Sequence, residues 1–417
     1  MNIKHNILKN LLFIIFFLVS LLGVFFYLVF FKDPILVSTQ EKRNLVNFSE
    51  LNETSFLDGT FQTTLDNTLA DQFVFRYDIV KIKSILDVKA SELFVPKSND
   101  EYKLTKVGDT PITRVGNSYY MINSLFYDYD TNLEERFLRR ASQINELAKD
   151  YPEIEMYLYK PTQGHETDIF DEANEVETYG KYYSDLLKNN LDIPYAELEI
   201  NDIDDYKNYF LQSDHHWSYH GSYQGYVDIV KLMFGKDEEV LIPTEFKTFN
   251  DELIFSGTFS SRTGYVYPGE PFYLYTFDLP EYSVYLDGKT QEIYDMNTFE
   301  KSIDSLDSLY MYGTANYTYG SDVIYESEYD DKETLLLIGD SYAAAVEPLL
   351  MEHFSTIYSI QPKGYFLKYW KKFNYDDFLA EHDVDKILFM YTVEYYFYTD
   401  EYGDHAELYD IHRNKGD

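Results

Sequence analysis

The sequence predicts an α/β fold: a parallel sheet with helices on both of its faces. Short apolar runs that follow charged residues are typical of buried parallel strands, and the clearest lie at 335–338 and 386–391. Segments with helical periodicity alternate with such runs along the chain. Strand–helix alternation of this kind favours parallel strands joined by right-handed crossovers.

One helix is expected at 131–150. Thr131 and Glu134 have the spacing of a capping box, which marks its start. Its periodicity also predicts which side chains face the core. These inward residues are Leu133, Phe137, Ile144 and Leu147.

The same criteria predict the other elements. Strands are expected at 117–129, 153–159, 194–197 and 356–360, and helices at 61–94, 179–189, 219–234 (with Ser218 as its cap) and 375–382. Residues 237–333 break this alternation because they are rich in Tyr, Gly, Pro and Asp. We interpret them as a β-rich insertion that walls a cleft.

Composition excludes several classes of function. The 417 residues include no Cys, which rules out disulfides and thiolate metal sites. Acidic residues number 72 against 35 basic ones, a formal charge of -37. This charge argues against nucleic acid and against strongly anionic partners, and favours a neutral or weakly charged substrate. The 43 Tyr residues suit stacking on sugars, although Tyr also fills cores.

A membrane anchor is expected near the amino terminus. Leu11–Phe31 carries no charge and, as a helix rising about 1.5 Å per residue, would span roughly 31 Å, the thickness of a bilayer core. Lys4 and Lys9 precede it, so the amino end should stay inside. A cleaved signal peptide is the alternative, but its apolar stretch would be shorter and would end in small residues.

These features predict the organisation of the whole chain. We expect a cytoplasmic tail at 1–10, the transmembrane anchor at 11–31, a polar tether at 32–60 and an extracytoplasmic domain at 61–417 that contains the insertion at 237–333. Within the helical region 61–94, the charged pair Asp71 and Arg76 has two interpretations. We favour an ion pair at a helix junction over a catalytic role.

Ser341 is the candidate nucleophile. It follows the strand at 335–338 through the tight turn Gly339-Asp340, and the helix-forming residues 342–346 come next. A Ser at this position presents its hydroxyl at the carboxyl end of a strand, where free N–H groups of the helix could stabilise an oxyanion. The alternative is a helix cap without chemistry, because Gly-Asp-Ser is a common turn.

The sequence Asp214-His215-His216-Trp217 is the second candidate. Asp214 and His216 are two residues apart and project the same way from an extended segment, so the carboxylate can orient the imidazole as a base. A metal site is an alternative, since His215, His216 and His220 with Asp214 supply enough ligands, although adjacent His residues usually point apart. A structural His216 buried by Trp217 is the other alternative.

Two further residues are candidates for binding substrate. Gln163 lies in the loop that follows the strand at 153–159, and ligands collect at the carboxyl ends of such strands. Arg262, within the insertion, is a candidate acyl or sugar contact. A structural ion pair is the alternative for Arg262.

The motifs at 214–217 and 339–341 resemble those of the bacterial DHHW proteins and, more broadly, of the SGNH-type domains of alginate O-acetylation proteins. The resemblance covers residues 61–417. It implies an SGNH-hydrolase-like parallel sheet in which the triad order is permuted, with Asp214 and His216 before the nucleophile Ser341. No equivalent of the Gly and Asn oxyanion donors of SGNH hydrolases is evident. We therefore assign this role to the N–H group of Ser341, with that of its neighbour Tyr342 as a second candidate.

The same resemblance implies supporting roles for four neighbours of the triad, namely His215, Trp217, Gly339 and Asp340. It also implies the activity: an extracytoplasmic enzyme, without cofactor or metal, that transfers an acyl group through an acyl-Ser intermediate to a cell-surface polysaccharide. A separate membrane protein would deliver the acyl donor. An acetyl esterase that uses the same triad, and a non-catalytic subunit of polysaccharide assembly that keeps the fold, are the alternatives.

Overall fold

The computed structural model describes the chain from Lys9 to Asn414 with gaps. The residues outside the description are 1–8, 20–21, 24–26, 28–32, 39–42, 54–55, 74, 77, 80–81, 84–85, 87–103, 108–109, 116–117, 122–128, 171–178, 250–256, 259–271, 287–288, 292–320, 394–404 and 415–417. Contacts divide the chain into two compact units: Met1–Phe94 with Ser261–Val266, and Val95–Ser260 with Tyr267–Asp417. The second unit therefore begins about thirty residues after the predicted start of the domain at 61.

The first unit begins with a helix that is described over residues 9–19, and its apolar side chains are exposed. None of the helices in the described part of the chain combines the length and the apolar character that crossing a membrane requires. The anchor proposed for 11–31 includes residues outside the description and stays a prediction.

The segment predicted to be a tether has local structure. It contains the paired strands β1 (Val37–Ser38) and β2 (Arg43–Asn44) and the 3-10 helix η1 (Phe48–Glu53). Helix α2 (Thr60–Gln72) holds this segment through two buried polar side chains.

The first of these side chains, Asp71, accepts a hydrogen bond of 2.9 Å from the Val46 N–H. The second, Gln72, exchanges hydrogen bonds with the backbone of Ile35 at 3.0 and 2.9 Å. The Asp71 carboxylate also lies 3.8 Å from the Arg76 guanidinium, which agrees with the ion-pair interpretation of this cluster.

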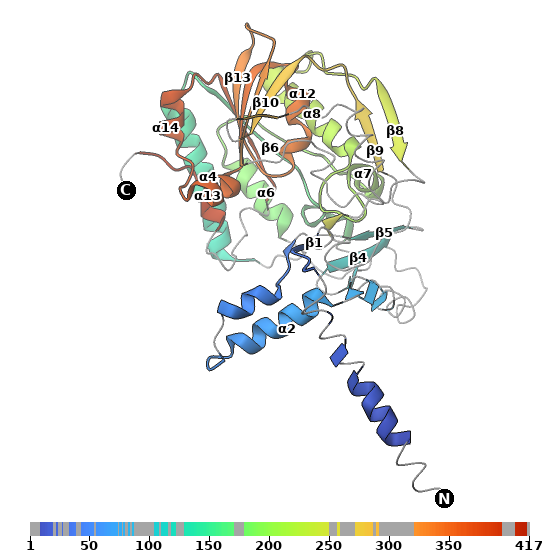
Figure 1. Ribbon diagram of the computed structural model, residues 1–417. Coiled ribbons are helices and arrows are strands. Elements are labelled where there is room, and N and C mark those ends of the chain that lie inside the picture. The colour runs from blue at the N-terminus through green and yellow to red at the C-terminus, as the bar shows by residue number, and fades with distance from the viewer. Residues whose placement is uncertain are drawn as a thin grey trace, which may run out of the picture. The chain divides into compact units, whose positions relative to one another are not determined.

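An eight-stranded sheet forms the centre of the second unit (Figure 1). Its strand order is β11-β10-β12-β14-β13-β15-β6-β7, and the five strands from β14 to β7 are parallel. The bounds of these parallel strands are Phe354–Ile360 (β14), Glu333–Gly339 (β13), Lys386–Met390 (β15), Glu155–Lys160 (β6) and Tyr195–Glu197 (β7). Each corresponds to a strand predicted from the sequence.

The segment 237–333 is more than an insertion. Three of its strands, β10 (Tyr282–Leu286), β11 (Lys289–Gln291) and β12 (Asp322–Ser327), extend the main sheet, and β12 pairs antiparallel with β14. The sheet is thus mixed rather than wholly parallel. Only β8 (Glu245–Phe249) and β9 (Phe272–Thr276) form a separate hairpin. A second small sheet combines β3 (Leu104–Val107), β4 (Thr110–Val115) and β5 (Ser118–Met121).

Helices cover both faces of the sheet (Figure 1). On one face α8 (Tyr219–Phe234) and α12 (Glu347–Leu350) pack on the strands; on the other lie α4 (Thr131–Asp150), α6 (Gly180–Asn189), α13 (Pro362–Tyr369) and α14 (Tyr375–Glu381). The short α7 (Ile203–Tyr209) precedes α8. Helix α13 was not predicted, because its apolar residues do not concentrate on one side.

Strand β13 shows why the fold has two cores. Leu335 and Leu337 belong to one apolar cluster, and Leu336 and Ile338 to the other, and all four are fully buried. A strand buried on both faces must be apolar at every position, as the sequence is here.

Helix α4 confirms its predicted inward face, since Leu133, Phe137, Ile144 and Leu147 are all buried. Its cap differs from the prediction. The Asp130 carboxylate, not the Thr131 side chain, accepts a hydrogen bond of 2.8 Å from the Asn132 N–H. Helix α4 shares an apolar cluster with β6, which lies two strands from β13, the strand that precedes Ser341.

We expect Phe137→Ala to lower the free energy of unfolding by about 3–5 kcal/mol, because Phe137 is fully buried and the mutation leaves a cavity. Leu138→Ala, one residue further on the outward side, is the control and should change it by less than about 1 kcal/mol. Urea unfolding followed by circular dichroism measures both. Equal effects would contradict the assigned helix face.

Candidate active site

The turn that carries Ser341 depends on the close approach of neighbouring atoms at Gly339. A Cβ on Gly339 would lie 2.7 Å from the Ala343 Cβ and 2.9 Å from a methyl of Leu337, so only glycine fits. The chain then continues as a single 3-10 turn, Ala343–Ala345 (η4), before α12. The regular helix predicted to start at 342 is therefore replaced by this tighter turn.

Asp340 fixes the same turn to the sheet. Its two carboxylate oxygens accept hydrogen bonds of 2.8 Å, one from the Tyr342 N–H and one from the Thr392 N–H just after β15. Burial raises the pKa of Asp340 to about 6, although these two hydrogen bonds and His216 act in the opposite direction. Asp340 therefore connects the Ser341 turn to the end of a neighbouring strand.

The structure brings Asp214, His216 and Ser341 together. The His216 Nε2 lies 2.7 Å from the Ser341 Oγ, and the His216 Nδ1 lies 2.6 Å from the Asp214 Oδ1. Asp214 and His216 are buried, whereas Ser341 is partly exposed. The imidazole thus bridges a buried carboxylate and an accessible hydroxyl, with one ring nitrogen for each.

Trp217 anchors the segment that carries the imidazole. Its side chain is fully buried and packs so closely on α8 that a Cβ on Gly225 would lie 2.5 Å from the indole ring. Ser218 caps α8 as predicted, since its hydroxyl accepts a hydrogen bond of 3.2 Å from the Gly221 N–H. The His216 backbone therefore cannot move independently of α8.

A segment that sequence analysis did not assign to the site holds the other oxygen of Asp214. The Thr258 N–H donates a hydrogen bond of 2.6 Å to the Asp214 Oδ2, and the Gly257 N–H donates one of 3.1 Å to the Ser213 Oγ. A Cβ on Gly257 would lie 2.4 Å from the Ser213 carbonyl oxygen. The sequence contains Gly257, but no pattern in the sequence indicates that this glycine lies beside Asp214.

His215 contacts the other residues of the site, and it is also part of the main alternative, a metal-binding site. Its ring lies 3.9 Å from the His216 ring, and its Nδ1 lies 3.4 Å from the Asp214 Oδ1. These three side chains could in principle hold a metal ion. Both ring nitrogens of His216 already face other groups, however, and binding through either would break the link to Asp214 or Ser341.

His220, the other proposed ligand, lies elsewhere. It hydrogen-bonds to the Tyr275 hydroxyl and stacks on Phe246, with ring centroids 5.8 Å apart. Burial lowers the pKa of His220. The structure therefore does not assemble the four-ligand set that the sequence allowed.

The predicted oxyanion donors need one correction. The Tyr342 N–H is committed to the Asp340 carboxylate at 2.8 Å, so it does not point to a site for an oxyanion. The Ser341 N–H has no hydrogen-bond partner within the described residues. Of the two amides proposed, only that of Ser341 is suited to stabilise an oxyanion.

Gln163 lies next to this centre, as predicted for a residue at the end of β6. Its Nε2 donates a hydrogen bond of 3.1 Å to the Tyr342 hydroxyl, which in turn donates to the His215 carbonyl. The Gln163 Oε1 and the Thr162 Oγ1 are buried without a hydrogen-bond partner among the described residues. Arg262 lies outside the described residues.

A buried ion pair supports the loop that presents Gln163. Lys160 contacts the carboxylates of Glu166 and Glu197 and the Ser184 hydroxyl. Burial lowers the pKa of Lys160, but the two carboxylates outweigh this effect and raise it above its ordinary value. The Gln163 N–H also donates to Glu166 at 2.8 Å, so the loop has a defined conformation.

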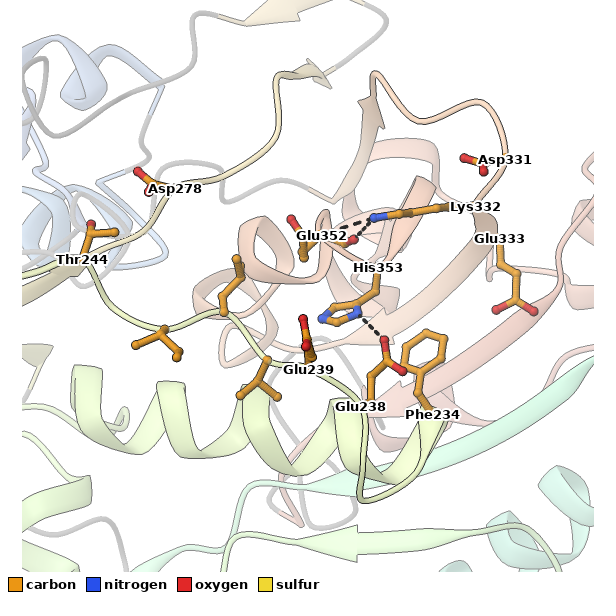
Figure 2. Close-up of a pocket in the computed structure, with 13 residues that line it drawn as sticks. Phe234, Glu238, Glu239, Thr244, Asp278, Asp331, Lys332, Glu333, Glu352 and His353 are labelled. Carbon is orange, nitrogen blue, oxygen red and sulfur yellow. Dashed lines mark hydrogen bonds and ion pairs between the residues drawn. The ribbon is translucent and has the colours of Figure 1, made fainter.

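A separate hollow of about 660 Å³ lies between the end of α8 and the chain after α12 (Figure 2). It contains six carboxyl groups, from Glu238, Glu239, Asp278, Asp331, Glu333 and Glu352. His353 in its wall bonds to the Tyr226 hydroxyl at 2.9 Å, and burial with the nearby Lys332 lowers the pKa of His353 to about 4. None of Asp214, His216 and Ser341 lines this hollow, so the candidate active site lies elsewhere.

The fold, a mostly parallel sheet between helices with Ser341 beyond the carboxyl end of β13, is the arrangement that the resemblance to SGNH-type domains implies. In open α/β sheets ligands bind at this edge, where connections leave to opposite faces. Here α12 leaves β13 on one face, and α13 leaves β14 on the other.

Comparison with solved structures finds proteins with a similar fold. A DHHW family protein from Eubacterium siraeum is similar with a TM-score of 0.52 and 16% identity, over 74% of this chain and 97% of that chain. Bacillus cereus PatB1 is similar with a TM-score of 0.52 and 16% identity, over 69% and 97%. A PatB1 structure with a sulfonyl adduct gives a TM-score of 0.51 and 15% identity, over 70% and 96%.

No protein-family model matches the sequence. A search of curated proteins finds no match. The resemblance to DHHW proteins that the motifs predicted is thus supported by the three-dimensional fold, which persists at identities where sequence comparison fails.

We expect Gly257→Ala to lower the free energy of unfolding by about 1–3 kcal/mol, because the new methyl group would overlap the Ser213 carbonyl and the Asp214 side chain. Thr258→Ala is the control: it keeps the backbone N–H that bonds to Asp214 and should have a smaller effect. Urea unfolding of both variants tests the contact. A tolerated Gly257→Ala would place the 257–258 segment away from Asp214.

The raised pKa of Asp340 predicts a pH dependence of stability. Because its folded pKa of about 6 exceeds the ordinary 3.8, the folded protein binds a proton at higher pH than the unfolded chain does. Between pH 7 and pH 4, wild type should therefore gain about 2 kcal/mol of unfolding free energy relative to Asp340→Asn. Unfolding curves of both proteins at both pH values measure the difference. A difference that is the same at pH 7 and pH 4 would contradict the raised pKa of Asp340.

Proposed function

We propose that the chain is an O-acyltransferase that uses Ser341, His216 and Asp214 to transfer an acyl group to a hydroxyl of a cell-surface polysaccharide. The observation that carries the proposal is the position of the His216 ring, 2.7 Å from the Ser341 Oγ and 2.6 Å from Asp214. A hydroxyl is a weak nucleophile until a neighbouring base accepts its proton. The contact between the His216 Nε2 and the Ser341 Oγ supports this role for His216.

In the first step the Ser341 Oγ attacks the acyl carbonyl while the His216 Nε2 takes the hydroxyl proton. Asp214 holds the Nδ1–H and stabilises the imidazolium that forms. The Ser341 N–H is the amide available for the oxyanion. When the tetrahedral intermediate collapses, the leaving group takes the proton from His216, and an acyl ester on Ser341 remains.

In the second step an acceptor hydroxyl loses its proton to His216 as it attacks the acyl ester. Collapse of this intermediate releases the acylated acceptor, and the proton returns from His216 to the Ser341 Oγ. A sugar hydroxyl as acceptor makes the reaction a transfer, and water makes it a hydrolysis. The same residues therefore serve a carbohydrate acetyl esterase, which is the alternative function.

Support for an activated nucleophile also comes from one of the structural neighbours. A PatB1 structure carries a sulfonyl adduct. Sulfonyl reagents react with activated nucleophiles, which is the property proposed for Ser341. At 15% identity we carry over the idea of the reagent as a probe, and the assignment of Ser341 depends on this chain's own geometry.

The remaining parts of the proposal concern location and partners. The uncharged stretch at 11–31 would anchor the protein with its catalytic unit outside the membrane. A separate membrane protein would supply the acyl donor from within. The charge of -37 is consistent with a neutral or weakly charged polymer as acceptor.

We expect Ser341→Ala to abolish labelling by phenylmethylsulfonyl fluoride and to lower acyl transfer by on the order of 10⁴–10⁶-fold, because the nucleophile is lost. Ser142→Ala, which removes an exposed hydroxyl from α4, is the matched control and should leave both unchanged. Mass spectrometry of the labelled protein and transfer from p-nitrophenyl acetate are the measurements. Polymer acylation that survives Ser341→Ala would leave the non-catalytic subunit as the better account.

The products distinguish transfer from hydrolysis. With p-nitrophenyl acetate as donor and polysaccharide as acceptor, a transferase forms acetylated polysaccharide, whereas an esterase releases only acetate. We expect acetylated polysaccharide with wild type and none with His216→Ala. Free acetate as the sole product would favour the esterase.

A further inference from the structure

The carboxyl end of α13 presents an unusual group of exposed side chains. Trp370 is 78% exposed, and Leu367 and Tyr369 are 49% and 41% exposed. The chain has only two Trp residues, and the other, Trp217, is fully buried. We refer to Leu367, Tyr369 and Trp370 as the aromatic platform.

The backbone at Trp370 is unfavourable for this residue type. Its φ of 54° lies in the left-handed region, where the residue that ends a helix is usually glycine. The Trp370 N–H donates a hydrogen bond of 2.7 Å to the Phe366 carbonyl, which fixes this conformation. A large apolar side chain therefore occupies a position where both its exposure and its backbone oppose stability, which points to a role outside folding.

The aromatic platform lies at the same edge of the sheet as Ser341. Lys368 and the Tyr369 hydroxyl contact Asp322 at 2.5 and 2.6 Å. Asp322 pairs with Ile360 at the carboxyl end of β14, and Ile360 pairs with Ile338, three residues before Ser341. At about 4.8 Å per strand, the anchor of the platform lies roughly 10 Å across the sheet from the strand that carries the nucleophile.

The charges around the platform favour a neutral ligand over an anionic membrane surface. Although three lysines flank Trp370, Lys368 is paired with Asp322 at 2.5 Å and Lys372 with Glu407 at 3.3 Å. Lys371 lies 6.0 Å from the Tyr369 ring. Because two of the three lysines are paired and the chain charge is -37, the patch offers little positive charge to attract anionic lipid headgroups.

We propose that the aromatic platform binds the acceptor polysaccharide, with the apolar C–H face of a neutral sugar ring stacked on the Trp370 indole and the polymer running along the sheet edge toward Ser341. This inference rests on the proposed function and specifies the surface on which the acceptor binds. Aromatic side chains with a polar rim suit such a ligand because they combine an apolar surface with hydrogen-bonding groups.

Tryptophan fluorescence of the full chain tests the binding step. The probe is the de-O-acylated cell-surface polysaccharide of the source organism, compared with phosphatidylglycerol vesicles. The polysaccharide should shift the emission of the exposed indole and protect it from acrylamide, and Trp370→Phe should remove this response. Protection by the vesicles but not by the polysaccharide would overturn the proposal, as would protection by neither.

Transfer kinetics test the role of the platform in the reaction. Trp370→Ala should raise the polysaccharide concentration needed for half-maximal transfer by about 5-fold, the effect of losing roughly 1 kcal/mol of stacking. Phenylmethylsulfonyl fluoride should still label Ser341. Trp370→Phe should recover most of the affinity, and Phe246→Ala, which removes an exposed aromatic side chain from β8, should change nothing.

Two further controls separate binding from folding and from catalysis. Trp370→Gly should raise the melting temperature, because glycine accepts the left-handed backbone, while it weakens polysaccharide use as Trp370→Ala does. If Trp370→Ala and Trp370→Gly both need the same polysaccharide concentration for half-maximal transfer as wild type, the inference is overturned. Absence of transfer by wild type, together with absence of labelling at Ser341, would instead reject the proposed function.

Discussion

The buried carboxylate of Asp214 is the constraint on which the site depends. A charge out of reach of water is tolerated only where donors surround it, and here one oxygen faces the His216 ring and backbone while the other accepts from Thr258. The hydrogen bonds to this carboxylate hold the segments 214–216 and 257–258 together and fix the orientation of the imidazole. Ser341 then completes the line from carboxylate to hydroxyl.

A second buried carboxylate serves the nucleophile. Asp340 accepts hydrogen bonds from Tyr342 and Thr392 and thereby joins the turn after β13 to the end of β15. The two carboxylates act differently because their hydrogen-bond partners differ: Asp214 bonds to a ring that can carry a proton, whereas Asp340 bonds to the backbone amides of Tyr342 and Thr392 and to the Thr392 side chain. Asp214 is therefore suited to acid–base chemistry, and Asp340 to the geometry of the turn.

The carboxyl edge of the sheet connects the fold, the site and the proposed acceptor surface. Parallel strands direct their loops to one edge, so β6, β13 and β14 deliver Gln163, Ser341 and α13 to the same side. The structural neighbours have this fold at about 16% identity, which indicates that the architecture tolerates wide change in sequence. A polymer at this edge can contact both Ser341 and the aromatic platform.

By itself the sequence determined the strands of the parallel sheet, the inward face of α4 and the two motifs that carry Asp214, His216 and Ser341, because these depend on local periodicity and residue type. Only the tertiary structure decided that β10, β11 and β12 extend the sheet, that Gly257 and Thr258 complete the surroundings of Asp214, and that Asp340 takes the Tyr342 amide from the oxyanion set. Most of these contacts join distant residues through backbone N–H and C=O groups. Since nearly every residue carries the same backbone groups, no residue type marks such contacts in advance.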